Sequence, residues 1–201
     1  MTEPRFELGA AMARVAAACG AAEGAEEALW CINRTVPALL GDQAAFLNPH
    51  ALREPGTPTA WTAAAAFMRV PDGRHHMIVA PVNFPPEQRH ELVDIALGHP
   101  GEVARTLRPL LLRDTALHAG FVKILQTFRA GSTMFAPMIW RGAYLGVLIC
   151  ASAARNTFSE QDLIAHQAFA GLAAACWVAQ GGPAWLGAHD LAGRPVRSHG
   201  T

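Results

Sequence analysis

The sequence predicts one α+β domain in which helices pack on a central antiparallel sheet of about six strands. Three observations favour this class. The length, 201 residues, is that of a single domain with a terminal extension. With 51 % hydrophobic and 16 % charged residues, the chain can bury a core and is too apolar to stay disordered. Its apolar residues follow helix or strand spacing in the order helix, helix, strand, loop, hairpin, helix, strand, helix, hairpin, helix.

Two helices are expected before the first strand. Residues 5–19 are rich in alanine and leucine, which favour helix, and Gly20 then supplies a stop. Between Glu23 and Leu40 apolar residues recur every three or four positions, which is the spacing of one buried helix face. Pro37 inside this second helix removes a backbone hydrogen bond, so we expect a kink or an early end there.

The period then changes from helix to strand. The short apolar run 43–48 predicts a strand, and the proline-rich residues 49–59 predict a loop. Two longer apolar runs, 61–70 and 75–84, are separated by a turn that contains Asp72 and Gly73. An Asp-Gly pair between two apolar runs is a strong hairpin signal. We therefore expect an antiparallel pair of strands here.

Two covering segments and a short strand follow this hairpin. Prolines 85 and 86 can open a helix, and the apolar positions that follow predict that it runs over 86–97. The sequence RPLLLRD predicts a short strand that ends at Asp114. The amphipathic segment 115–128 predicts another helix over the sheet.

The last third of the domain is a second hairpin and a long helix. Strands are expected at 132–140 and 144–152, joined by the turn Arg141-Gly142-Ala143. Ser159 and Asp162 have the spacing of a capping box, and the apolar residues after them predict a helix over about 160–179. The domain boundaries we expect are an N-terminal helix (1–22), a core domain (23–180) and a flexible C-terminal tail (181–201).

The charge balance argues against some classes of partner. Sixteen basic and sixteen acidic side chains cancel, and the isoelectric point is about 7.1, so the basic footprint of a nucleic-acid-binding protein is absent from the sequence. Apolar stretches are broken by charges or proline before they reach the length of a membrane span, and the first residues lack the order of a secretory signal. We expect no contact with membranes and a cytoplasmic location.

Four pieces of the second half carry a characteristic order and spacing. They are GHPGEVARTLRPLLLRD (98–114, with Val103 and Asp114), STMFAPMIWRGAYLGVL (132–148, with Ser132, Pro137, Arg141, Gly142, Gly146, Val147 and Leu148), the run Phe158, Ser159, Glu160, Asp162 and Leu163, and the alanine-rich helix that follows. Together they resemble the GAF domain family, cytoplasmic sensor modules related in fold to PAS domains. Residues 23–97 agree with that family only in the order of elements, and the proline-rich loop is longer than in the family. We interpret the chain as a free-standing GAF-like domain of a bacterial type.

The resemblance implies a sheet with helices on both faces and packed N- and C-terminal helices. It also implies a homodimer through residues 5–40 and 160–180, and a cavity between the sheet and residues 86–128 that binds an unidentified small molecule. Binding would close the segments 84–100 and 115–131, repack the terminal helices and signal to a partner protein, a regulator or kinase. The candidate ligand-binding residues are Phe67, His76, Val79, Phe84, His99, Asp114, Phe121, Ser132 and Phe135. Since strand side chains alternate, ordinary core packing is the other interpretation of the aromatic residues.

The cysteines raise an enzymatic alternative. Cys19, Cys31, Cys150 and Cys176 form no C-x-x-C pair, and we interpret them as buried reduced thiols. The GAF-like free methionine sulfoxide reductases use cysteines at the pocket mouth, so a small Cys-dependent redox enzyme is one alternative. Redox sensing is another, if the first and last helices bring Cys19 and Cys176 together. No residue is predicted to be catalytic.

The nine histidines raise a second alternative, a haem or metal redox sensor. Such a site needs convergent ligands, and the sequence contains no His-x-x-x-His pair that would place two on one helix face. We therefore predict no metal ligand and leave the cofactor unidentified. A purely structural dimer, with its cavity filled by its own side chains, is the third alternative.

Overall fold

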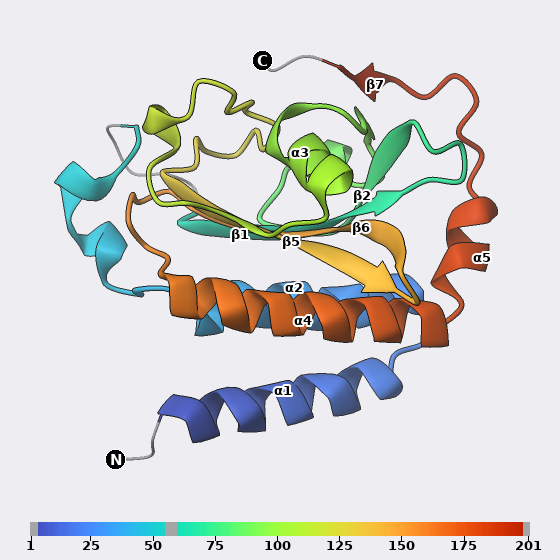
Figure 1. The fold of residues 1–201 in the computed structure, drawn as a ribbon, viewed down its shortest axis with the longest axis horizontal. Coiled ribbons are helices and arrows are strands. Elements are labelled where there is room, and N and C mark those ends of the chain that lie inside the picture. The colour runs from blue at the N-terminus through green and yellow to red at the C-terminus, as the bar shows by residue number, and fades with distance from the viewer. Residues whose placement is uncertain (1–3, 55–59, 199–201) are drawn as a thin grey trace.

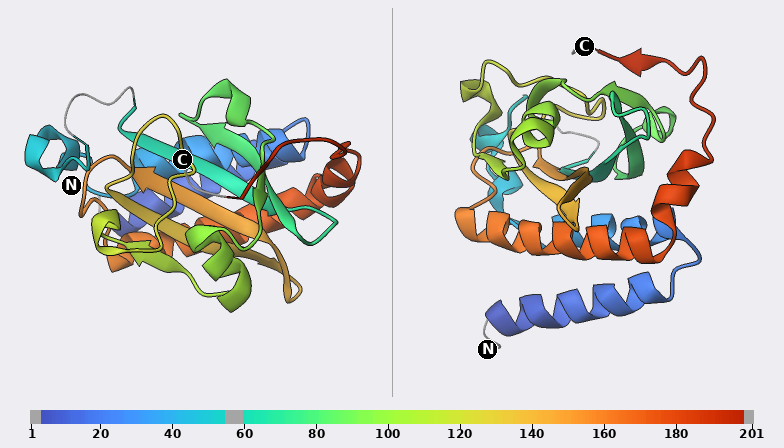
Figure 2. Two further views of the ribbon diagram at one scale, coloured as in Figure 1. Left: turned by 90° about the horizontal axis from the view of Figure 1, so that it is seen from above. Right: turned by 45° about the vertical axis from the view of Figure 1, so that its right-hand side comes forward.

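The computed structural model describes residues 4–54 and 60–198 and has the α+β arrangement that the sequence predicts (Figure 1). A mixed sheet lies between two covers. Helices α2 and α4 pack on one face, while α3 and long connections lie on the other. Helix α1 lies along α2 and α4 on the side away from the sheet, as the right-hand view of Figure 2 shows. The terminal helices are therefore in contact, as predicted.

The element boundaries are as follows. The α-helices are α1 (Pro4–Gly20), α2 (Ala25–Leu39), α3 (Gly98–Thr106), α4 (Glu160–Ala179) and α5 (Gly182–Gly187). Single 3-10 turns lie at Ala45–Leu47, Pro49–Ala51, Pro86–Gln88 and Thr115–Leu117. The strands are β1 (Thr62–Arg69), β2 (His75–Val82), β3 (Leu92–Asp94), β4 (Leu110–Leu112), β5 (Ser132–Trp140), β6 (Ala143–Ser152) and β7 (Val196–Arg197).

The seven strands are ordered β4-β5-β6-β1-β2-β3-β7, so the hairpin β5–β6 lies inside the sheet. Neighbours pair antiparallel except β3 and β7, which pair in parallel. Both predicted hairpins are present with nearly the predicted ends. The capping box of α4 is also formed: the N–H of Asp162 donates to Ser159 Oγ at 3.2 Å, and the N–H of Ser159 donates to Asp162 Oδ2 at 2.8 Å.

Alternation along the strands divides the core between the two faces of the sheet. On β1, Ala66 and Met68 face the helices α2 and α4, while Phe67 faces α3 and the connections. The helix side holds the larger cluster, which includes Leu29, Phe169 and many smaller apolar residues. Helix α4 is long and apolar enough, by length and composition, to cross a membrane, but 44 % of its most apolar window is buried within the protein, against β5 and α2.

The prediction of a strand at 43–48 is wrong. Residues 45–47 form a 3-10 turn, because Asp42 accepts from the N–H groups of both Ala44 and Ala45 and holds the chain in a local turn. Phe46 stacks on Trp61 with ring centroids 5.3 Å apart instead of entering the sheet. Of the loop predicted at 49–59, residues 55–59 lie outside the described residues.

The prediction of a helix over 86–97 is also wrong. Pro86 opens only one 3-10 turn, and His90 has a left-handed backbone with φ of 64°, which ends helical geometry. Leu92 and Val93 then pair with the start of β2 as strand β3. Of the apolar stripe that suggested a helix, Leu92 and Val93 therefore belong to a short buried strand, and residues 95–97 form the turn between β3 and α3.

The segment predicted as a helix at 115–128 contains one 3-10 turn, which Asp114 caps by accepting from the N–H of Ala116. The residues after it have no regular structure and lie across the sheet. Their backbone groups bond to a distant side chain, Gln88, instead of to one another. We call residues 121–130 the cover segment.

Candidate functional site

A cavity of about 50 Å³ lies between the sheet and the cover segment, on the face away from α2 and α4. Strands β1, β5 and β6 form its floor, and α3 and the cover segment close it. The lining residues are Ala63, Ala64, Phe67, Phe84, His99, Pro100, Phe121, Val122, Lys123, Ile124, Leu125, Phe128, Ala130, Thr133, Phe135, Ile149 and Ala151. The wall is therefore mainly aromatic and aliphatic, with few polar groups.

His99 is a buried polar side chain of this wall. It is the second residue of α3, is 8 % exposed, and lies nearly parallel to Phe135 with ring centroids 5.9 Å apart. The Phe121 and His118 rings are 6.0 and 5.7 Å away. Burial lowers the pKa of His99, so the imidazole is neutral at pH 7. Its Nδ1 is buried and has no hydrogen-bond partner among the described residues.

Five of the nine predicted ligand-binding residues line this cavity: Phe67, Phe84, His99, Phe121 and Phe135. The strand and hairpin positions brought them together as expected, because Phe67 and Phe135 share a face of the sheet. The other four do not line it.

Each of those four has a different local role. Val79 lies on the opposite face, in the cluster against α2 and α4. Asp114 caps a turn and lies 3.6 Å from Arg155, and the Ser132 hydroxyl donates to the Ala154 carbonyl at 2.8 Å. His76 is hydrogen-bonded to the Tyr144 hydroxyl at 2.8 Å, and burial, with a smaller effect of Arg69, lowers its pKa to about 4.

Gln88 is a residue that the sequence analysis missed. It is 1 % exposed, and its side chain ties the cover segment to the chain after β2. Its amide donates to the Ile124 carbonyl at 2.9 Å, and its Oε1 accepts from the N–H of Gln126 at 3.0 Å. A third bond nearby, from Thr127 Oγ1 to the Asn83 carbonyl, is 2.6 Å long. These contacts could not be predicted, because no pattern in the sequence links Gln88 to residues 124 and 126.

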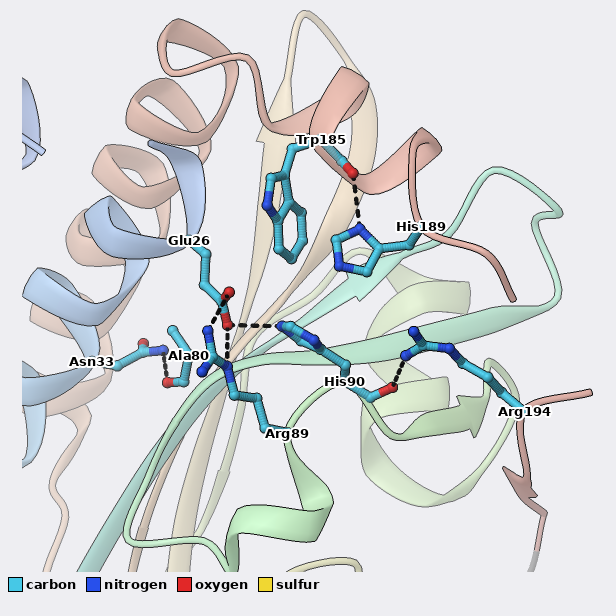
Figure 3. A network of polar contacts seen from close by, with 8 residues as sticks. All are labelled: Glu26, Asn33, Ala80, Arg89, His90, Trp185, His189 and Arg194. Carbon is cyan, nitrogen blue, oxygen red and sulfur yellow. Dashed lines mark hydrogen bonds and ion pairs between the residues drawn. The ribbon is translucent and has the colours of Figure 1, made fainter. Parts of the chain in front are cut away.

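The two residues after Gln88 hold the first turn of α2 (Figure 3). Arg89 donates to both carboxylate oxygens of Glu26 at 2.9 and 2.8 Å, and His90 Nε2 lies 2.9 Å from Oε1 of the same group. Burial alone would raise the pKa of Glu26, but the bonds from His90 and Arg89 outweigh it and lower the pKa to about 2. The C-terminal segment joins this cluster, because Trp185 and His189 pack against the His90 ring at centroid distances of 5.5 and 5.1 Å.

The cysteines do not provide a reactive thiol at the cavity, since none lines it. Cys19 and Cys150 are buried in the cluster on the helix side of the sheet. Burial raises the pKa of Cys19 to about 12, with neighbouring Cys176 and Cys31 adding to the effect, and burial also raises the pKa of Cys150 and Cys176. A thiol with a raised pKa is a poor nucleophile at neutral pH. Within 4–54 and 60–198, no three His, Cys, Asp or Glu side chains form a group that could hold a metal ion.

Comparison with known proteins identifies the family and the fold. The family model of the GAF domain matches residues 34–177. The fold is similar to the GAF domain of a phosphoenolpyruvate-protein phosphotransferase from Acinetobacter, with 12 % identity, a TM-score of 0.70, and coverage of 95 % of this chain and 99 % of that one. The GAF domain of the corresponding enzyme from Coxiella burnetii has 20 % identity, a TM-score of 0.70, and coverage of 90 % and 99 %.

A third solved structure, a putative GAF sensor protein from Burkholderia vietnamiensis, has 14 % identity, a TM-score of 0.61, and coverage of 86 % of this chain and 94 % of that one. Identities this low establish the shared fold and leave the ligand undefined. Among curated proteins, no sequence matches this chain.

Proposed function

The chain belongs to the GAF family, whose domains are small-molecule-binding sensory modules, and from this premise we propose that it binds its ligand in the cavity under the cover segment and signals to a partner protein, a regulator or kinase. One observation carries the proposal. The cavity is closed by an irregular segment whose hydrogen bonds run to Gln88, next to residues that hold the first turn of α2.

The size of the cavity means that binding and movement of the cover segment are coupled. Pockets for larger ligands have volumes of roughly 300–1,000 Å³, whereas this cavity holds about 50 Å³. Any ligand of more than a few atoms must therefore push the cover segment outward. A ligand that binds the opened form better shifts the population toward that form.

Movement of the cover segment reaches the helices through a short chain of contacts. If Ile124 and Gln126 move, their hydrogen bonds to Gln88 either break or pull Gln88 along. In the second case the backbone of residues 88–90 is displaced as well. Arg89 and His90 then change their hold on Glu26 in α2. Because Trp185 and His189 also contact His90, the segment after α4 responds to the same displacement (Figure 3).

The test is native mass spectrometry of the purified protein, with release and identification of any small molecule that it retains. We expect a retained compound in the wild-type protein and its loss in Ala151→Leu, because that side chain lines the cavity and the added atoms fill it. Ala38→Leu, on an exposed position of α2, is the matched control and keeps the compound. Equal retention by Ala151→Leu and the wild type would place the ligand elsewhere.

We also propose that the chain forms a homodimer through its terminal helices, as expected from the sequence. Helix α4 presents Ile164, which is 66 % exposed, on one face with the exposed Ala168. An Ile164→Asp variant should weaken the dimer about tenfold or more in multi-angle light scattering. Leu47→Asp, at a position that is 76 % exposed and lies outside the helices, in the 3-10 turn Ala45–Leu47, is the control. A wild-type protein that is monomeric at high micromolar concentration contradicts the proposal.

A further inference from the structure

The only lysine of the sequence lies in the wall of the cavity. Of the sixteen basic residues, the other fifteen are arginines, which are distributed over the chain. Lys123 is half-buried in the cover segment, between Val122 and Ile124, and all three residues line the cavity. In the part of the chain that the structure describes, no hydrogen bond or ion pair engages its ammonium group.

A second polar group in the same wall is also unused. His99 is held by ring contacts with Phe135 and Phe121, yet its buried Nδ1 has no hydrogen-bond partner among residues 4–54 and 60–198. A buried polar atom without a partner is costly, and such atoms in native structures commonly face an absent ligand or water. Thr133 differs, because its hydroxyl already donates to the Cys150 carbonyl at 3.0 Å.

The lining contains no aspartate or glutamate. Lys123 and His99 therefore belong to a wall that, apart from Thr133, is apolar and includes the rings of Phe67, Phe84 and Phe128. Such a wall favours a small apolar ligand that carries one negative charge. It disfavours a cation, which has no acidic partner here, and a polyanion, because its further charges would be buried against apolar side chains.

We propose that the ligand is a small monocarboxylate with an apolar body, its carboxylate paired with Lys123 and within reach of His99. This inference rests on the proposed function, since it names the ligand class of the same cavity. The volume of about 50 Å³ accepts only part of a short aliphatic acid, because one water needs roughly 10–15 Å³ on the same scale. The rest of such an acid requires the cover segment to move outward, as the proposed function expects.

A single lysine makes a direct spectroscopic test possible. Reductive methylation with ¹³C-formaldehyde labels Lys123 and the N-terminal amine, keeps both charges, and gives two separate signals. We expect butyrate to shift the ¹³C signal of dimethylated Lys123 in a saturable way and to leave the N-terminal signal unchanged. 1-Butanol, which has the same chain without the charge, should bind the unlabelled protein about tenfold more weakly than butyrate in calorimetry.

Variants separate charge recognition from the cavity itself. Lys123→Met should weaken butyrate binding about tenfold and leave 1-butanol binding unchanged, whereas Lys123→Arg should restore much of the butyrate affinity. Arg108→Met removes an exposed positive charge outside the lining and serves as the control.

The outcomes distinguish the ligand class from the proposed function. If 1-butanol binds as tightly as butyrate, or if Lys123→Met binds butyrate like the wild type, the assignment of a carboxylate is wrong while the cavity remains a ligand site. If neither probe binds and the purified protein retains no compound, the proposed function itself fails.

Discussion

Replacing Gly146 by alanine is expected to destabilise the domain by about 2–4 kcal/mol. This residue of β6 lies against β1, and a Cβ atom on it would collide with the carbonyl oxygen of Phe67 and lie 3.0 Å from the Cα atom of Met68. Backbone atoms of a central strand cannot move aside without breaking the ladder. Urea denaturation at pH 7 measures the effect.

Gly171→Ala is the matched control for this substitution. That glycine lies in α4, where a Cβ would meet no atom within 4 Å. Alanine favours helix over glycine by about 1 kcal/mol, so this variant should be slightly more stable than the wild type. An unfolding midpoint for Gly146→Ala equal to that of the wild type would show that β6 and β1 are spaced more widely than described.

The second large effect is expected at Glu26. Its folded pKa of about 2 lies below the usual 4.5, so the carboxylate stabilises the fold above pH 5, and this contribution is lost as the pH falls from about 5 to 2. We expect Glu26→Gln to cost about 2 kcal/mol at pH 7. The difference in free energy of unfolding between this variant and the wild type should shrink toward pH 2.

The neighbouring Glu27 provides the control. Its side chain is 51 % exposed, and its Oε1 lies 3.6 Å from Nη1 of Arg34, so the two residues form a solvent-exposed ion pair. Glu27→Gln should therefore change stability by less than about 0.5 kcal/mol at any pH in this range. If the two variants behave alike in urea denaturation between pH 7 and pH 3, the bonds from Arg89 and His90 do not stabilise the first turn of α2.

The parts of the fold that depend on local sequence could be predicted. The turn at Asp72 and Gly73 lies between the strands that it joins, and the box of Ser159 and Asp162 spans one turn of helix. The strand β3 could not be predicted, because the apolar stripe around Leu92 and Val93 suits either a helix or a strand, and β2 decides between them.

The residues of the candidate site also fall into a group that could be predicted from the sequence and a group that could not. Phe67 and Phe135, proposed from the two hairpins, lie on one face of the sheet, whereas Val79 from the same hairpin as Phe67 lies on the other. A strand position fixes the face on which a side chain lies, but the sequence alone does not say which face carries the cavity. Lys123 and Gln88 were missed since both depend on an irregular segment, and the partners of Gln88 are 36 and 38 residues away in the chain. No period in the sequence reports a contact of that kind.

The two outermost strands of the sheet are short, with three residues in β4 and two in β7. A long, flat border would offer free N–H and C=O groups on which a second molecule could extend the ladder. Here the border at β3 is already covered by β7, with Arg197 2.7 Å from Glu91 beside it. Short outer strands of this kind limit the length of edge on which a second copy of the chain could extend the sheet.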